Sequence, residues 1–149
     1  DIGSCVNGYV ADMTRLFAIG DLPPAAWRAY DLTLELFQFF ETEARPGVQP
    51  AELYQQILDL VDKAGLGEFF MGRGAERVTF VAHGVGLELD EFPVISANFP
   101  FPLDADMVVA FEPKFLLPDI GLVGLEDTGR VTADGVEWLT RAPREVHKA

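Results

Sequence analysis

Apolar residues recur at helical spacing in two stretches of the first half of the chain, which predicts helices over residues 25–43 and 51–64. Pro50 suits the first turn of the second helix, and Gly65 suits the position just after its end. The side chains expected to face the core are Trp27, Tyr30, Leu34 and Phe37 in the first helix and Leu53, Ile57, Leu60 and Val61 in the second. Neither helix carries residues that suggest chemistry, so we expect the site to lie elsewhere.

The first fifteen residues predict a β-hairpin, because Asn7-Gly8 is a strong turn signal and both positions accept a positive φ. With a two-residue turn, residue i faces residue 15 minus i. Asp1 and Asp12 then become diagonal neighbours on one face, about 7–8 Å apart or less. Two carboxylates at that distance repel each other unless a cation lies between them. The alternative is that both acids face solvent on the wet side of an antiparallel sheet.

Runs of β-branched and aromatic residues in the second half of the chain predict strands separated by turns. The expected strands cover residues 77–82, 87–91, 107–112 and 123–128, and a short hairpin over residues 131–140 turns at Asp134-Gly135. Strands that accompany two helices in a chain of 149 residues favour one α+β domain.

His83 stands at the end of an apolar, strand-like run and directly before Gly84, with Gly86 two residues further on. Neutral imidazole is the commonest metal ligand among protein side chains, and glycines allow the backbone to approach a bound group closely. The alternative for this stretch alone is a histidine that is hydrogen-bonded within the core.

Two glutamates, Glu112 and Glu126, also lie inside apolar, strand-like runs. A carboxylate is costly to bury without a partner, so each is a ligand, a paired charge or an edge residue. Together with Asp1, Asp12 and His83 they form an oxygen-rich set that suits Mn, Co, Fe or Zn. Five ligands, several of them able to bridge, suit two divalent ions about 3.5–4 Å apart.

The net charge of −13 argues against nucleic acid or an anionic membrane surface as a partner, since both require basic patches. The acidity reflects either a solvated surface or buried ligands whose charge a metal neutralises. Cys5 is the one cysteine, which excludes an internal disulfide and favours a reducing compartment. The chain has no run of 18 apolar residues and opens with no signal peptide, so we expect a cytoplasmic protein.

Four segments, in this order, resemble the metal-binding motifs of the M24 metallopeptidases with the pita-bread fold: DIGSCVNGYVADMTR, VAHGVGLELDEFP, VVAFEPKF and GLVGLEDTGRVTADGVEWLT. That family includes methionine aminopeptidases, Xaa-Pro aminopeptidases and prolidases. The spacing from His83 to Glu112 and the Glu-Asp-Thr context of Glu126 look more like the Xaa-Pro aminopeptidase and prolidase branch. The resemblance implies a curved antiparallel sheet with helices packed on one face. It also implies that residues 1–149 form the C-terminal portion of a catalytic domain, without its upstream part.

By that resemblance, Asp1 binds one ion, Asp12 and Glu126 bridge both, and His83 and Glu112 complete the other. The two ions hold a bridging hydroxide that attacks a scissile carbonyl. Glu112 shuttles a proton toward the leaving amine. The family is commonly dimeric, which implies a homodimer here.

Three departures from the family pattern affect these expectations. The family's usual second histidine, which is thought to contact substrate, falls at Asp90, so we count Asp90 with Glu112 and His83 as a catalytic candidate. The arginine that prolidase-like members often carry two residues before the second glutamate ligand falls at Gly124, so proline specificity does not carry over. The family's segment before the first aspartate, with another substrate-side histidine, is not part of this chain.

Three functions fit these residues. The first is an Xaa-Pro aminopeptidase- or dipeptidase-like peptidase with two divalent metal ions. The second is a hydrolase or lyase acting on a small non-peptide molecule, which a pocket remodelled by Asp90 and Gly124 would suit. The third is a metal-free protein-binding module, and the presence of all five candidate ligands argues against it.

Overall fold

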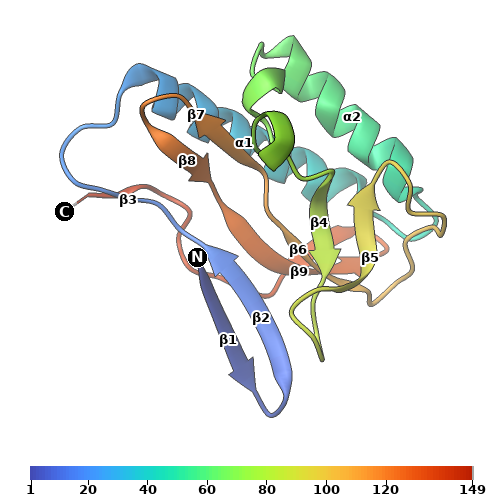
Figure 1. Cartoon of the computed structure of the whole chain (residues 1–149). Coiled ribbons are helices and arrows are strands. Elements are labelled where there is room, and N and C mark those ends of the chain that lie inside the picture. The colour runs from blue at the N-terminus through green and yellow to red at the C-terminus, as the bar shows by residue number, and fades with distance from the viewer. Residues whose placement is uncertain (149) are drawn as a thin grey trace.

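A curved antiparallel sheet forms the centre of the fold in the computed structural model, which describes residues 1–148 (Figure 1). Its strands lie in the order β1 (Ile2–Val6), β2 (Tyr9–Thr14), β9 (Glu126–Thr132), β6 (Val108–Phe111), β4 (Phe80–Gly84) and β5 (Glu91–Ser96). Strand β10 (Gly135–Trp138) also pairs with β9. Two small sheets flank the main one, β7 (Lys114–Leu117) with β8 (Gly121–Gly124) and β3 (Phe17–Ala18) with β11 (His147–Lys148).

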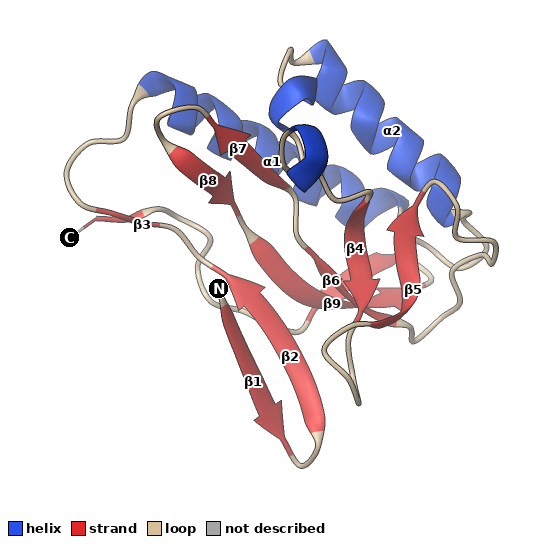
Figure 2. Cartoon of the chain, viewed as in Figure 1, coloured by secondary structure: helices blue, strands red, loops and turns tan. Residues whose placement is uncertain are grey.

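Two helices, α1 (Pro24–Glu43) and α2 (Pro50–Lys63), cover one face of this sheet (Figure 2). Two short 3-10 helices, η1 (Gly67–Phe69) and η2 (Gly74–Glu76), lie between α2 and β4. Both predicted helices are confirmed, as are the proline in the first turn of α2 and the left-handed Gly65 just beyond it. Within residues 1–148, no helix combines the length and the apolar character needed to cross a membrane.

The buried face of α1 agrees with the prediction in part. Tyr30 and Phe37 are buried as expected, whereas Trp27 and Leu34 are only half-buried, and Leu36 and Phe40 complete the buried face. In α2, Leu53, Ile57 and Val61 are buried as expected, but Leu60 is exposed. Periodicity finds the apolar side of a helix, but the neighbouring sheet decides which of the adjacent apolar residues are covered.

Phe111 in β6 joins the sheet to α1. Its ring stacks on Phe40 with the centroids 4.1 Å apart, and Phe37 meets it edge-on at 5.0 Å. Because side chains alternate across a strand, the residues on either side of Phe111 point to the opposite face of the sheet. Glu112 is one of them, so this aromatic contact turns a carboxylate away from the core.

The predicted hairpin is confirmed with its register. Val6 pairs with Tyr9 and Ile2 with Met13, while Asn7 and Gly8 both have positive φ. The hairpin extends from the lower edge of the sheet in Figure 1, and all of β1 is exposed.

Three strand predictions need correction. The strand expected over residues 77–82 begins at Phe80 and runs to Gly84. Residues 87–90 form a bent loop rather than a strand, because the Glu91 carboxylate accepts hydrogen bonds from the backbone N–H groups of Leu87 and Glu88, both at 3.1 Å. The single strand expected over residues 123–128 is two strands, with a break at Leu125.

Candidate metal centre

Four buried acidic or imidazole side chains converge from the four central strands of the sheet. Asp12 lies on β2, Glu126 begins β9, Glu112 directly follows β6, and His83 lies on β4. Each is between 3 and 8% exposed. The pairing of Thr14 with Glu126, 112 residues apart in the sequence, brings β2 and β9 together. The site therefore depends on contacts between distant segments.

Asp12, His83 and Glu126 are close enough to share an ion. Each offers one ligand atom, and these atoms lie within 4.8 Å of one another. His83 Nε2 is 3.9 Å from Glu126 Oε1 and 3.9 Å from Glu112 Oε1. Ligands bound at about 2.1 Å to one ion are roughly 3–4 Å apart, so only small movements separate this arrangement from coordination.

The charges in this cluster also favour a cation. The pKa of Glu126 is raised from its usual 4.5 to about 7, mainly by burial, and the nearby carboxylates of Asp12 and Glu112 contribute to this rise. A hydrogen bond from Thr14 Oγ1 to Glu126 Oε2, at 2.8 Å, and the neighbouring His83 act in the opposite direction. The donor set therefore fits a divalent cation, which would replace the missing counter-charge.

His83 is oriented by groups beside its Nδ1, on the side of the ring away from Glu112 and Glu126. Its Nδ1 lies 3.0 Å from the carbonyl oxygen of Gly84 and 3.3 Å from Asp90 Oδ1. With a proton on Nδ1, the ring donates to these oxygens and presents the lone pair of Nε2 to Glu112 and Glu126. Metal-binding histidines are commonly held in this way.

Asp12 is held by the neighbouring strand. Its backbone N–H donates to Thr128 Oγ1, and Thr128 Oγ1 donates in turn to the carbonyl oxygen of Asp12, both at 2.9 Å. One side-chain oxygen of Asp12 accepts the N–H of Met13 at 3.0 Å. These bonds fix the position of Asp12 relative to β9.

Glu126 is positioned by a buried ion pair beside it. Arg15 Nη2 contacts Asp127 Oδ1 at 2.7 Å, and Arg15 Nη1 donates to the carbonyl oxygen of Glu126 at 2.8 Å. Arg144 Nε contacts the other oxygen of Asp127 at 2.6 Å. Sequence reasoning missed Arg15, Asp127 and Arg144, although an aspartate next to a glutamate in an apolar run was a usable signal.

The remaining predicted site residues lie at the rim. Asp1 is exposed and lines a cavity of about 220 Å³ together with Glu112 and Lys114. Asp90 has a side chain that is 71% exposed and lines a second cavity, of about 360 Å³, together with His83. The roles assigned to these rim residues stay predictions.

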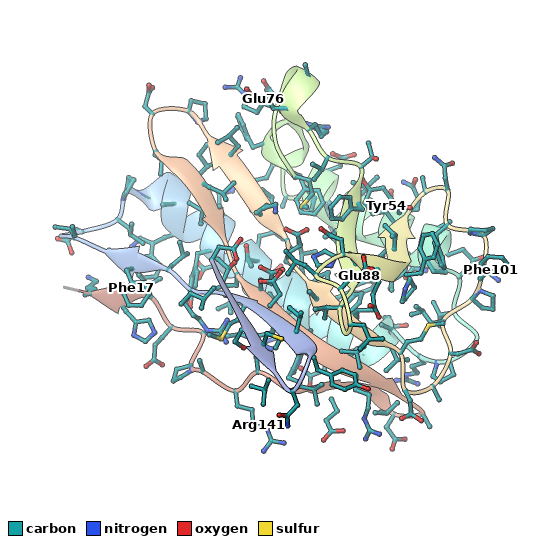
Figure 3. The ribbon with its side chains drawn as sticks, turned by 60° about the horizontal axis from the view of Figure 1, so that its bottom comes forward. Phe17, Tyr54, Glu76, Glu88, Phe101 and Arg141 are labelled. Carbon is teal, nitrogen blue, oxygen red and sulfur yellow. The ribbon has the colours of Figure 1, made fainter. Side chains whose placement is uncertain are left out.

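The second cavity is bounded by the loop between β4 and β5. Glu88 lies on this loop, on the same side of the sheet as the β1–β2 hairpin (Figure 3). The two segments touch, because the N–H of Val10 donates to the carbonyl oxygen of Gly86 at 2.7 Å.

Comparison with known proteins identifies the family of the chain. The model of "Metallopeptidase family M24" matches residues 1–133. The chain belongs to metallopeptidase family M24. Over 146 residues this M24 chain is 32% identical both to the "Putative dipeptidase YkvY" of Bacillus subtilis and to the "Xaa-Pro dipeptidase" of Pyrococcus furiosus. Each match covers 98% of this chain, but 38% and 40% of the relatives.

Solved structures of similar proteins superpose closely on this chain. The X-Pro aminopeptidase from Thermotoga maritima superposes with a TM-score of 0.88 at 28% identity, covering 99% of this chain and 40% of that one. The prolidase from Pyrococcus horikoshii gives 0.85 at 31% identity, covering 97% and 40%. The predicted pita-bread fold, with its curved antiparallel sheet and helices on one face, is confirmed. The M24 chain spans about 40% of the length of these relatives.

Proposed function

We propose that the M24 chain forms part of an Xaa-Pro dipeptidase-like metallopeptidase, a hydrolase that uses two divalent ions. The main support is that Asp12, His83 and Glu126 converge within 4.8 Å on one face of the sheet. Relatives whose names read Xaa-Pro dipeptidase support the substrate class.

In this proposal Asp12, His83, Glu112 and Glu126 would hold the ions, together with Asp1 at the rim of the cavity that also contains Glu112. Mn, Co, Fe and Zn all suit this set of carboxylates with one imidazole. When bound, such ions supply a nucleophile from water near neutral pH and polarise the scissile carbonyl.

Glu112 is the residue best placed to move a proton. One of its oxygens faces His83 Nε2 at 3.9 Å, while the other pairs with Lys114 at the cavity. Its carboxylate therefore lies between the predicted ligands and the space in which a substrate would bind. A group in this position can carry a proton toward a leaving amine, as general acid–base catalysis requires.

The test combines metal content with turnover. Protein purified without chelator is analysed for metal and assayed with Mn²⁺ on a panel of Xaa-Pro and other dipeptides. We expect about two divalent ions per chain and hydrolysis that EDTA abolishes. Protein that neither binds Mn²⁺ nor gains melting temperature from it would contradict the proposal and favour a protein-binding module.

Two observations favour a second candidate on the same scaffold. Asp90 contacts His83 at the position of the family's second histidine, and Gly124 has no side chain at the position of its arginine. A pocket altered at both positions suits a small non-peptide substrate. Metal binding without turnover of any dipeptide would favour this hydrolase or lyase.

A further inference from the structure

The cavity beside Glu112 is small and lies next to the predicted ligands. Its volume is about 220 Å³, below the roughly 300–1,000 Å³ of sites for drug-sized molecules. Asp1, Thr14, Glu112 and Lys114 line it, together with Leu122 and Gly124. A space of this size suits a single amino-acid residue rather than an extended peptide.

Two positively charged side chains reach this cavity, Arg15 and Lys114. Arg15 is buried and all three of its nitrogens donate hydrogen bonds, to Asp127 and to four backbone carbonyl oxygens. The side chain of Lys114 is 31% exposed, and its ammonium group pairs with Glu112. An ammonium group has three donors, so Lys114 is the cation here with donors to spare.

The register of β7 and β8 explains why the positive charge in this cavity comes from residue 114 and not from residue 124. Lys114 pairs directly with Gly124. A Cβ atom at residue 124 would lie 2.7 Å from Lys114 Cβ and 2.7 Å from the carbonyl oxygen of Pro113. Residue 124 therefore has no room for a side chain, and Lys114 occupies the space across the strand pair.

Glu112 determines when Lys114 is available. Without an ion, the ammonium group compensates the buried Glu112 carboxylate. A divalent cation bound by Glu112 would take over that role and weaken the hold on Lys114. The freed ammonium would then be a local positive charge in a chain of net charge −13, and an anionic group could bind it.

We propose that Lys114 binds the C-terminal carboxylate of a short peptide, so that the site selects dipeptides over peptides that continue beyond the cavity. This inference rests on the proposed function and names its substrate class. Three observations support it: the Lys114–Glu112 pair, the lack of room for a side chain at Gly124, and the size of the cavity.

The test compares Lys114→Met and Lys114→Arg with the exposed control Lys63→Met, in the Mn²⁺-loaded protein at its full natural length. Substrates are an Xaa-Pro dipeptide and the same dipeptide with its C-terminal carboxylate converted to an amide. For Lys114→Met we expect kcat/KM on the free acid to fall about 10- to 100-fold, the value of a hydrogen bond to a charged group. The loss should lie mainly in KM. On the amide, kcat/KM should change less than about threefold. Lys114→Arg should restore part of the preference for the free acid over the amide.

Equal losses on the acid and the amide would overturn the inference, since they would mean that Lys114 acts through Glu112 or the fold. Binding provides a second readout that needs no turnover. By calorimetry on Mn²⁺-loaded protein, L-proline should bind more tightly than L-prolinamide, and Lys114→Met should remove the difference. Equal binding of the two by the unaltered protein also overturns the inference. Absence of turnover with that binding difference intact counts against the proposed function alone.

Discussion

Glu126→Gln should make the metal-free protein more stable, although it removes a predicted metal ligand. The pKa of Glu126 is raised from 4.5 to about 7, first of all by burial. Because the folded chain holds this proton more tightly than the unfolded chain, the stability associated with it is present below about pH 4.5 and is lost as the pH rises through about 7. Above pH 7 the buried charge opposes folding.

The size of this effect follows from the same pKa difference. At 1.36 kcal/mol per pKa unit, the ionised carboxylate costs the fold about 3 kcal/mol at pH 8. Glutamine removes the charge, keeps an oxygen for the hydrogen bond from Thr14, and offers its N–H groups to Asp12 and Glu112. For a chain of this length, about 3 kcal/mol corresponds to a rise of roughly 6–12 °C in Tm.

Thermal unfolding followed by circular dichroism in EDTA, at pH 4 and pH 8, measures this difference. The gain should be present at pH 8 and small at pH 4, and the exposed control Glu43→Gln should show neither. Mn²⁺ at about 1,000 times Kd should reverse the order, since only the unaltered protein gains the full stability of a bound ion, about 4.1 kcal/mol at that concentration. A Glu126→Gln protein that is less stable than the unaltered protein in EDTA at pH 8 would refute the reasoning.

Three further variants test other parts of the site. Glu112→Gln should lower kcat by about 10²- to 10⁴-fold with an unchanged far-ultraviolet spectrum, and near-normal turnover would contradict its role in proton transfer. Gly124→Ala should lower the free energy of unfolding by about 1–3 kcal/mol in denaturant titrations, because its Cβ would lie 2.7 Å from Lys114 Cβ and from the Pro113 carbonyl oxygen. An unchanged midpoint would show that β7 and β8 can move apart without cost. Asp90→His should change the ranking of kcat/KM across a dipeptide panel, and a uniform change would mean that residue 90 acts only by orienting His83.

Elements with strong local signals could be predicted from the sequence. Asn7-Gly8 fixes the first hairpin and its register, and Pro50 and Gly65 mark both ends of α2. The loop over residues 87–90 could not be predicted, because a carboxylate that follows it in the chain determines its shape. Alternating apolar residues there match a strand equally well.

Some residues of the candidate site could likewise be identified from the sequence, and others could not. Glu112 and Glu126 could be identified because a carboxylate in an apolar run needs a partner, and Asp12 followed from the hairpin register. The groups that hold these ligands could not, since Thr14 reaches Glu126 only through a strand pairing across 112 residues. Lys114 could not be identified, because only the pairing of β7 with β8 places it opposite Gly124.

The charges of the site link metal binding to substrate binding. Without an ion, the buried carboxylates are balanced in two ways: Glu126 retains a proton up to about pH 7, and Glu112 pairs with Lys114. A divalent ion bound by both glutamates would replace both, so binding should release a proton near neutral pH and free an ammonium group at the cavity. An anionic substrate that binds this ammonium would then favour the ion-bound state, and the ion would increase the affinity for the substrate by the same factor.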